Sequence, residues 1–230
     1  MSDSIVLARK SIHDESSQIT APGKGVALCL LLVDRSSSMQ VHGDTPRTAA
    51  NELIATIRDA PGADRTLFGL MTFGSDVTLD VAPVRACHAP LLDRYEAKGS
   101  TALFKAVHDA LAIAHEFHGF AKTVYGADAK VAISVITDGA DTVVPSSALA
   151  PKTRKLAEIA RGKGFVMQAI GLGIDSTELA KLLGFEPGLA RNAPASRAGI
   201  HASMHHTSGS FLGTMSFLVN DDTPDPSDAN

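Results

Sequence analysis

Apolar residues gather along the chain in runs of strand length, separated by segments in which apolar positions repeat at helical spacing. The run at 26–33, VALCLLLV, is continuously apolar, which is typical of a central strand covered on both faces. The runs at 67–73 and 77–81 are joined by a short GSD turn and predict an antiparallel hairpin. Two further strands are predicted at 131–136 and 165–170.

The intervening segments predict helices. Thr45 and Pro46 are suitable as the cap and first residue of one helix, and a second is expected to begin near Ser100 and Thr101. The second helix should place its apolar residues on one face because they recur three and four positions apart. The remaining helices are predicted at 153–161, 176–183 and 210–219.

Strands that alternate with helices predict an α/β fold: a doubly wound, mostly parallel central sheet with one antiparallel edge strand and helices on both faces. We expect one domain over 25–219. Residues 1–24 read as an N-terminal extension in which 5–8 form a short edge strand. The segment 220–230 is acidic, contains proline and is almost without apolar residues, so we expect a disordered tail.

Composition excludes several classes of protein. The 230 residues carry a net charge of −4, and acidic and basic residues are interspersed. The basic stripe that is typical of nucleic-acid binding proteins is therefore not found in the sequence. The N-terminus lacks the apolar stretch of a secretory signal, and no apolar run is long enough to span a membrane. Cys29 and Cys87 suit neither a metal site nor a disulfide framework. We therefore expect a cytoplasmic protein.

Three loops carry the candidate chemistry. The first strand leads directly into Asp34, Ser36 and Ser38; Thr101 opens the second helix; and Asp138 follows the strand at 131–136. In a doubly wound sheet, ligands bind beyond the carboxyl ends of the strands. We therefore expect these loops to meet at one edge of the sheet.

The spacing of Asp34, Ser36 and Ser38 suits a tight loop around a hard cation, because alternate residues point the same way. Carboxylate and hydroxyl oxygens favour magnesium, with manganese or calcium as alternatives, over zinc. Two neutral hydroxyls leave such an ion incompletely neutralised, so it would attract a carboxylate from another molecule. This pattern predicts a binding site.

These residues resemble the von Willebrand factor A domain family with its metal-ion-dependent adhesion site (MIDAS), over roughly 24–219. VDRSSSM matches the family's DxSxS loop, KGSTALFKAV its threonine loop, ITDG its later aspartate, and GLGID also fits the pattern. The resemblance implies that the metal ligands are the following residues: Asp34, Ser36, Ser38, Thr101 and Asp138. Ser37 departs from the family, in which glycine is common there, and matters only if that residue needs a positive φ.

The resemblance also implies what the ion does, namely capture of an acidic residue of a partner protein. Stand-alone cytoplasmic members often serve as adaptors to AAA-type ATPases, or to kinase and phosphatase modules in stress-response or defence operons. Around the site, Arg35, Ser100 and Asp141 are candidate partner-binding residues. Arg35 should be exposed, to pair with an acidic partner or to be solvated, and Asp141 could replace Asp138 as a ligand.

Two other functions fit part of the pattern. A magnesium-dependent phosphohydrolase on a similar sheet would need a second aspartate as acid and base where this chain has Ser36. A surface adhesion domain would need a signal peptide or an anchor. We expect no enzyme activity.

Two histidine groups complete the candidates. A solvated helix face is expected for His108, His115 and His118 in preference to a transition-metal site. A flexible surface loop is expected around 201–206.

Overall fold

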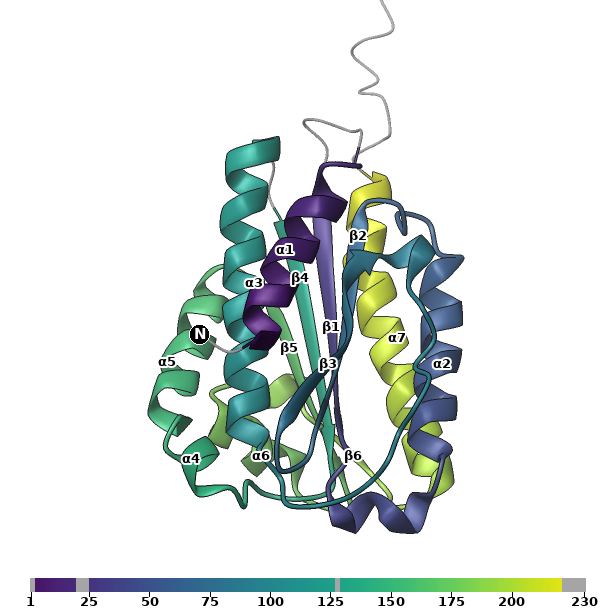
Figure 1. Ribbon diagram of the computed structural model, residues 1–230, viewed down its shortest axis with the longest axis vertical. Coiled ribbons are helices and arrows are strands. Elements are labelled where there is room, and N and C mark those ends of the chain that lie inside the picture. The colour runs from purple at the N-terminus through teal and green to yellow at the C-terminus, as the bar shows by residue number, and fades with distance from the viewer. Residues whose placement is uncertain (1–2, 20–24, 127–128, 221–230) are drawn as a thin grey trace, which may run out of the picture.

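The structure, a computed structural model, describes residues 3–19, 25–126 and 129–220. Its strands are β1 Val26–Asp34, β2 Thr66–Phe73, β3 Val77–Arg85, β4 Ala129–Thr137, β5 Val166–Leu172 and β6 Arg191–Ala193. They form one sheet in the order β3-β2-β1-β4-β5-β6 (Figure 1). All neighbours pair in parallel except β2 and β3, which are antiparallel. The predicted doubly wound fold with one antiparallel edge strand is therefore confirmed.

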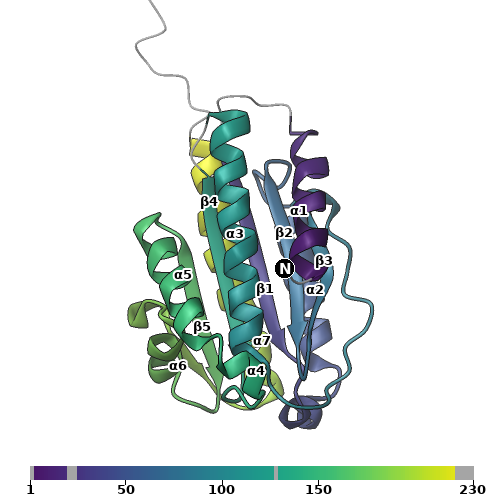
Figure 2. The same ribbon diagram turned by 60° about the vertical axis from the view of Figure 1, so that its left-hand side comes forward.

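Helices cover both faces of this sheet (Figures 1 and 2). The α-helices are α1 Asp3–Ser16, α2 Thr45–Arg58, α3 Leu103–Tyr125, α4 Val144–Ser147, α5 Ala150–Gly162, α6 Ser176–Leu183 and α7 Arg197–Asn220. Short 3-10 turns are η1 Ser37–His42, η2 Ala86–His88 and η3 Pro187–Leu189. One apolar core lies between the sheet and α1, α3, α5 and α6, and the other lies between the sheet and α2 and α7.

Strand β1 occupies the centre of the sheet, as its uninterrupted apolar sequence predicts. All nine of its residues are buried, because it pairs with β2 on one side and β4 on the other. Leu30 and Leu32 point into one core, while Leu31 and Val33 point into the other. This rigid central strand ends at Asp34, so the sheet itself fixes the position of the first candidate ligand.

Residues 5–8 belong to helix α1, so the predicted edge strand is wrong. Ile5, Ala8 and Ile12 recur at helical spacing and are buried against β3 and α3. The hydroxyl of Ser11 donates to the carbonyl of Pro83 at 2.7 Å, which ties the helix to the sheet edge. The run IVLA at 5–8 reads as a strand because Val6 and Leu7, which are exposed on the helix, hide the helical spacing of the buried residues.

Helix α7 begins at Arg197, not near Ser210 as predicted, and its first half replaces the expected surface loop. The buried apolar residues of the helix are spaced by one or two helical turns and lie against the sheet and α2: Ile200, Met204, Phe211, Met215 and Leu218. Serine, glycine and histidine lie between them, and their low helix propensity concealed the periodicity. Residues 221–230, where a disordered tail is expected, lie outside the described residues.

His115 and His118 of α3 are partly buried against Phe165, so the expected solvated face is wrong for these two residues. The ring centroids of His115 and His118 lie 5.3 and 5.4 Å from that of Phe165. The Nε2 of His115 lies 3.2 Å from the carbonyl oxygen of Leu156. Within residues 3–19, 25–126 and 129–220, no three or more His, Cys, Asp or Glu side chains gather in a way that could hold a metal.

The cysteines and the lengths of the helices relate to the disulfide and membrane-span expectations from the sequence. Cys29 and Cys87 are both free thiols, and burial raises the pKa of Cys29 far above its usual range. Among the described helices, none combines the length and the apolar character needed to cross a membrane.

Candidate metal centre

The three chemically distinctive loops meet at the carboxyl ends of β1 and β4. The backbone N–H of Ser37 donates to the carbonyl of Gly99 at 3.0 Å, which joins the first loop to the second. The N–H of Thr142 donates to the carbonyl of Thr101 at 2.9 Å, which joins the third loop to the second. Backbone hydrogen bonds therefore set the spacing of the loops that supply the candidate ligands.

Four of the five predicted ligands lie in a continuous chain of hydrogen bonds. The carboxylate Oδ1 of Asp34 accepts from the backbone N–H of Ser36 at 2.7 Å. The hydroxyl oxygens of Ser36 and Ser38 are 3.0 Å apart, and the hydroxyl of Ser38 donates to Oδ1 of Asp138 at 2.7 Å. Side-chain oxygens from two loops, 100 positions apart in sequence, thus converge beside the end of β1.

The chemistry and spacing of these oxygens fit a small hard cation. Neighbouring ligands of six-coordinate magnesium, each 2.0–2.1 Å from the ion, lie about 3 Å apart. The spacings of 3.0 Å between Ser36 and Ser38 and 2.7 Å between Ser38 and Asp138 are close to this value. All donors are oxygens, as magnesium, manganese and calcium prefer.

The electrostatics of Asp34 also favour a cation. Asp34 is fully buried, and this burial raises the pKa of its carboxyl group, with a further contribution from the negative charge of Asp138. Hydrogen bonds from Thr137 and Ser36 oppose that rise. Among the described residues, no positive charge acts on the pKa of Asp34, and a bound divalent cation would supply one.

Thr101 reaches the same edge of the sheet through its backbone. Thr101 is buried, and its N–H donates to the hydroxyl of Thr142 at 2.8 Å. It lies two residues before α3, in the same loop as Gly99. Its role as a metal ligand remains a prediction from the resemblance.

Two residues that support Asp34 were not among the predicted site residues. The hydroxyl of Thr137 donates to Oδ2 of Asp34 at 2.5 Å, and the hydroxyl of Tyr95 donates to the Asp34 carbonyl at 2.6 Å. Thr137 could have been found, because it is the last residue of β4, directly before Asp138. Tyr95 lies in a long loop before α3 and carries no comparable signal in the sequence.

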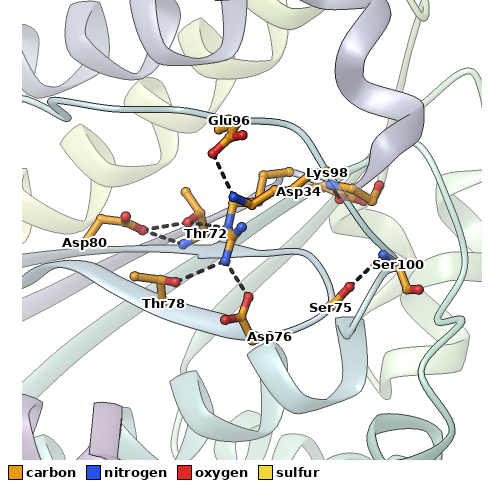
Figure 3. Close-up of polar contacts among 11 residues, drawn as sticks. Asp34, Thr72, Ser75, Asp76, Thr78, Asp80, Glu96, Lys98 and Ser100 are labelled. Carbon is orange, nitrogen blue, oxygen red and sulfur yellow. Dashed lines mark hydrogen bonds and ion pairs between the residues drawn. The ribbon is translucent and has the colours of Figure 1, made fainter.

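The side chain of Arg35 lies against the β2–β3 hairpin, so the expectation that it is exposed is wrong. Only 13% of the side chain is accessible. Its Nη2 donates to Asp76 at 2.5 Å and to Thr78 at 3.1 Å, and its Nε donates to Thr72 at 3.1 Å (Figure 3). Thr72 in turn donates from its hydroxyl and its N–H to Asp80. Arg35 thus attaches the first loop to the hairpin.

We expect loss of this attachment to weaken metal binding, although Arg35 need not touch the ion. Arg35→Gln and Asp76→Asn should each lower the Mn²⁺ affinity by about 10-fold, the lower range for residues that orient metal ligands. The double variant should lose little more, because both changes break the same contact. Calorimetric titration measures this effect.

Lys98→Gln is the matched control for the Arg35 variant. It also removes one positive charge from a neighbouring loop, but within the described residues the ammonium of Lys98 pairs only with exposed Glu96, at 2.7 Å. Its affinity for Mn²⁺ should stay within about twofold of the wild type, since exposed pairs contribute little. Equal losses in the Lys98 and Arg35 variants would show that only local charge matters.

Ser100 and Asp141 have contacts within the chain that position the loops. The N–H of exposed Ser100 donates to the hydroxyl of Ser75 at 2.9 Å (Figure 3). Asp141 accepts from the N–H of Phe104 at 2.8 Å, in the first turn of α3, and from the hydroxyl of Ser147 at 2.7 Å. Partner binding by Ser100, Asp141 and Arg35, and metal binding by Asp141, stay predictions.

Ser37 fits its position without strain. No residue other than glycine has a positive φ in the described ranges, so Ser37 adopts an ordinary backbone conformation. It is exposed, between the ligand positions 36 and 38. The departure from the glycine that is common in the family therefore leaves the loop geometry intact.

Comparison with known proteins identifies the fold. No family model and no curated protein matches the chain. The vWF domain of the type V pili tip protein Mfa5 from Porphyromonas gingivalis matches with a TM-score of 0.57 and 9% identity, covering 84% of this chain and 97% of that one. The chain therefore has the fold of a von Willebrand factor A domain.

Two matching structures contain metal, according to their descriptions. Proximal thread matrix protein 1 from the mussel byssus, with a zinc-occupied MIDAS motif, has a TM-score of 0.51 and 17% identity over 83% of this chain and 47% of that chain. The manganese-loaded TRAP protein of Plasmodium vivax has a TM-score of 0.50 and 18% identity, and the match covers 82% of this chain and 75% of that one. The chain thus spans about half the length of the byssus protein.

Proposed function

We propose that the chain is a protein-binding module with a MIDAS, in which a divalent ion captures an acidic residue of a partner protein. The ligands would be Asp34, Ser36, Ser38, Thr101 and Asp138, with Asp138 acting directly or through water. The observation that carries this proposal is the hydrogen-bonded chain of oxygens from Ser36 through Ser38 to Asp138, next to buried Asp34. When bound, the ion would supply the positive charge that attracts the partner's carboxylate.

The accessibility of the ligands supports a site that is open to a macromolecule. Asp34 and Ser36 are buried, whereas Ser38 is exposed and Asp138 is partly exposed. A partner can therefore approach from the side of Ser38 and Asp138 without rearrangement of the sheet. Two carboxylates and neutral hydroxyls leave a coordination position that a partner's carboxylate can complete.

Magnesium is the ion that we propose, with manganese or calcium as substitutes. Oxygen-only ligands and spacings near 3 Å support it. The byssus protein is described with zinc and TRAP with manganese, so the affinities for both ions should be compared with that for magnesium.

We propose binding without catalysis. A phosphohydrolase of this architecture would need a side chain at position 36 that exchanges protons near neutral pH, and serine does so poorly. The hydroxyl of Ser36 shares a hydrogen bond with Ser38 in the ligand chain, which supports a ligand role.

The partner class rests on family resemblance: an AAA-type ATPase, or a kinase or phosphatase module, inside the cell. We propose neither nucleic acid nor a membrane as partner, since acidic and basic residues are interspersed at a net charge of −4. The pilus-tip role named for Mfa5 makes surface adhesion the alternative location. Fractionation of cells that produce the native gene product distinguishes these locations.

Titration of the full chain with Mn²⁺, followed by electron paramagnetic resonance, tests the metal site. We expect one ion per chain, displaced by Mg²⁺ in excess. Parallel titrations with Ca²⁺ and Zn²⁺ rank the ions, and p-nitrophenyl phosphate with Mg²⁺ tests for turnover. Absence of Mn²⁺ binding would contradict the metal site, and turnover lost in Asp34→Ala would contradict a purely binding role.

A further inference from the structure

A cavity of about 350 Å³ lies on the α7 side of the sheet, away from the candidate ligands. Its walls come from β5, β6, η3 and α7, and none of the five candidate metal ligands contributes. The volume falls within the range of small-molecule sites, at its lower end. The lining residues are Val166, Gln168, Leu189, Arg191, His205, His206, Gly209 and Ser210.

The cavity exists because β6 is short. This strand pairs with β5 only from Ile170 to Leu172, so within the described residues the first half of β5 is paired with β4 on one side and with no strand on the other. Helix α7 crosses this open part of the sheet and leaves the space between them. A small molecule can therefore reach side chains of a strand that is otherwise covered.

Gln168 is an unusual residue for this strand face. Val166, Ile170 and Leu172 point toward the same apolar core, and Gln168 lies between them with 3% exposure. Its Oε1 accepts from the hydroxyl of Ser134 at 3.2 Å. Among the described residues, this contact with Ser134 is the one hydrogen bond of the Gln168 side chain, which also lines the cavity. The amide therefore presents unused donors to the cavity, and a ligand would satisfy them.

The lining of the cavity also carries a positive charge, on Arg191. Arg191 donates from Nη1 to the carbonyls of Gly188 and Ala190 at 3.1 and 2.8 Å, and it pairs with no carboxylate in the described ranges. Burial lowers the pKa of His206, and the nearby Arg191 and His205 lower it further. The lining includes no Asp or Glu. An anion in the cavity would therefore be attracted by Arg191 and repelled by no carboxylate of the lining.

We propose that this cavity binds a small organic carboxylate, with Arg191 and Gln168 as the main donors to its oxygens. His206 and Ser210 supply further polar contacts at the rim. Val166, Leu189 and Gly209 provide apolar walls that suit a hydrocarbon or aromatic body, which inorganic phosphate lacks. The site is separate from the metal centre and does not depend on its function.

The test is a titration of the full ¹⁵N-labelled chain with sodium benzoate, followed by ¹H–¹⁵N NMR. Benzoate should shift saturably the amide signals of residues 166–168 and 205–210. Arg191→Gln should weaken binding by about 10-fold or more, the effect of losing a charge-assisted hydrogen bond. Gln168→Met keeps the side-chain volume and should weaken it by about threefold.

Benzamide, inorganic phosphate and a matched charge variant serve as controls. Arg94→Gln removes the same charge from a side chain that is 92% exposed in the loop before α3, and it should bind benzoate like the wild type. Neutral benzamide should bind at least about 10-fold more weakly, because it cannot pair with Arg191. Absence of saturable shifts, equal binding of benzamide, tighter binding of phosphate, or unchanged benzoate binding by Arg191→Gln would overturn the proposal.

Discussion

Replacement of Asp34 by asparagine is expected to weaken Mn²⁺ binding by at least about 100-fold. Residues that only orient metal ligands change affinity by 10–100-fold, so loss of one of two ligand carboxylates should reach or exceed that range. Asparagine keeps an oxygen that can accept the hydrogen bond from Ser36 N–H, which is 2.7 Å long. Calorimetric titration of the wild type and the variant measures the ratio of affinities.

Asp34→Asn should fold, and the pH dependence of its free energy of unfolding provides the control. Because burial and Asp138 raise the pKa of Asp34 in the folded, metal-free chain, the folded state binds this proton more tightly than the unfolded state does. This group therefore favours folding most below its unfolded pKa, and the contribution is lost as the pH rises through its folded pKa. Asp34→Asn should remove that dependence, as urea unfolding between pH 4 and pH 7 would show.

A stable Asp34→Asn variant with unchanged Mn²⁺ affinity would contradict the assignment of Asp34. Asp109→Asn offers a comparison, since Asp109 is also a buried aspartate, paired with Lys105 at 2.6 Å on α3. That variant should lose stability, because it breaks an ion pair, but should keep its metal affinity.

Gly99→Ala is expected to destabilise the chain by about 1–3 kcal/mol and to weaken metal binding by about 10-fold. Gly99 has φ +77°, a conformation that alanine adopts only with strain. An added Cβ would also overlap the hydroxyl of Ser75, which accepts from Ser100 N–H at 2.9 Å. The Gly99 carbonyl holds Ser37 at 3.0 Å, so the distortion reaches the metal loop.

Two variants separate the causes of this effect. Gly126→Ala has the same backbone penalty at φ +62° but open space around the new Cβ, so it should destabilise without changing metal affinity. Combining Gly99→Ala with Ser75→Ala removes the overlap and should restore part of the lost stability. Urea unfolding and Mn²⁺ titration measure both quantities, and a Gly99→Ala variant that matches the wild type in both would refute the proposed loop contact.

The sequence predicted the sheet well because its strands are continuously apolar. Strand β1 lies where the run VALCLLLV predicts, and the hairpin follows from two apolar runs with a short turn. Helices α1 and α7 were misread for a different reason. In α1 the exposed Val6 and Leu7 complete a continuous apolar run with Ile5 and Ala8, whereas in α7 polar and small residues separate the buried apolar positions. In both helices packing against the sheet decides the structure over local propensity.

The candidate site was predictable where ligands follow strands directly. Asp34 ends β1 and Asp138 follows β4, so the order of strands brings them to one edge. The contacts of Arg35 and Tyr95 were not predictable, because they depend on how the hairpin and the long loop before α3 fold over that edge. Side-chain direction within a loop is a tertiary property that spacing alone does not determine.

The most direct test of the central claim is capture of partner proteins by the full chain. Wild type and Asp34→Ala are each immobilised and exposed to lysate of the native organism, with Mg²⁺ or with chelator, and bound proteins are identified by mass spectrometry. If a metal ion bridges the two proteins, the partner should bind only to the wild type and only with Mg²⁺. An excess of free glutamate or of an acidic peptide should then release the partner. The same partners in all four samples, unaffected by acidic competitor, would contradict the claim that a bound ion grips the partner.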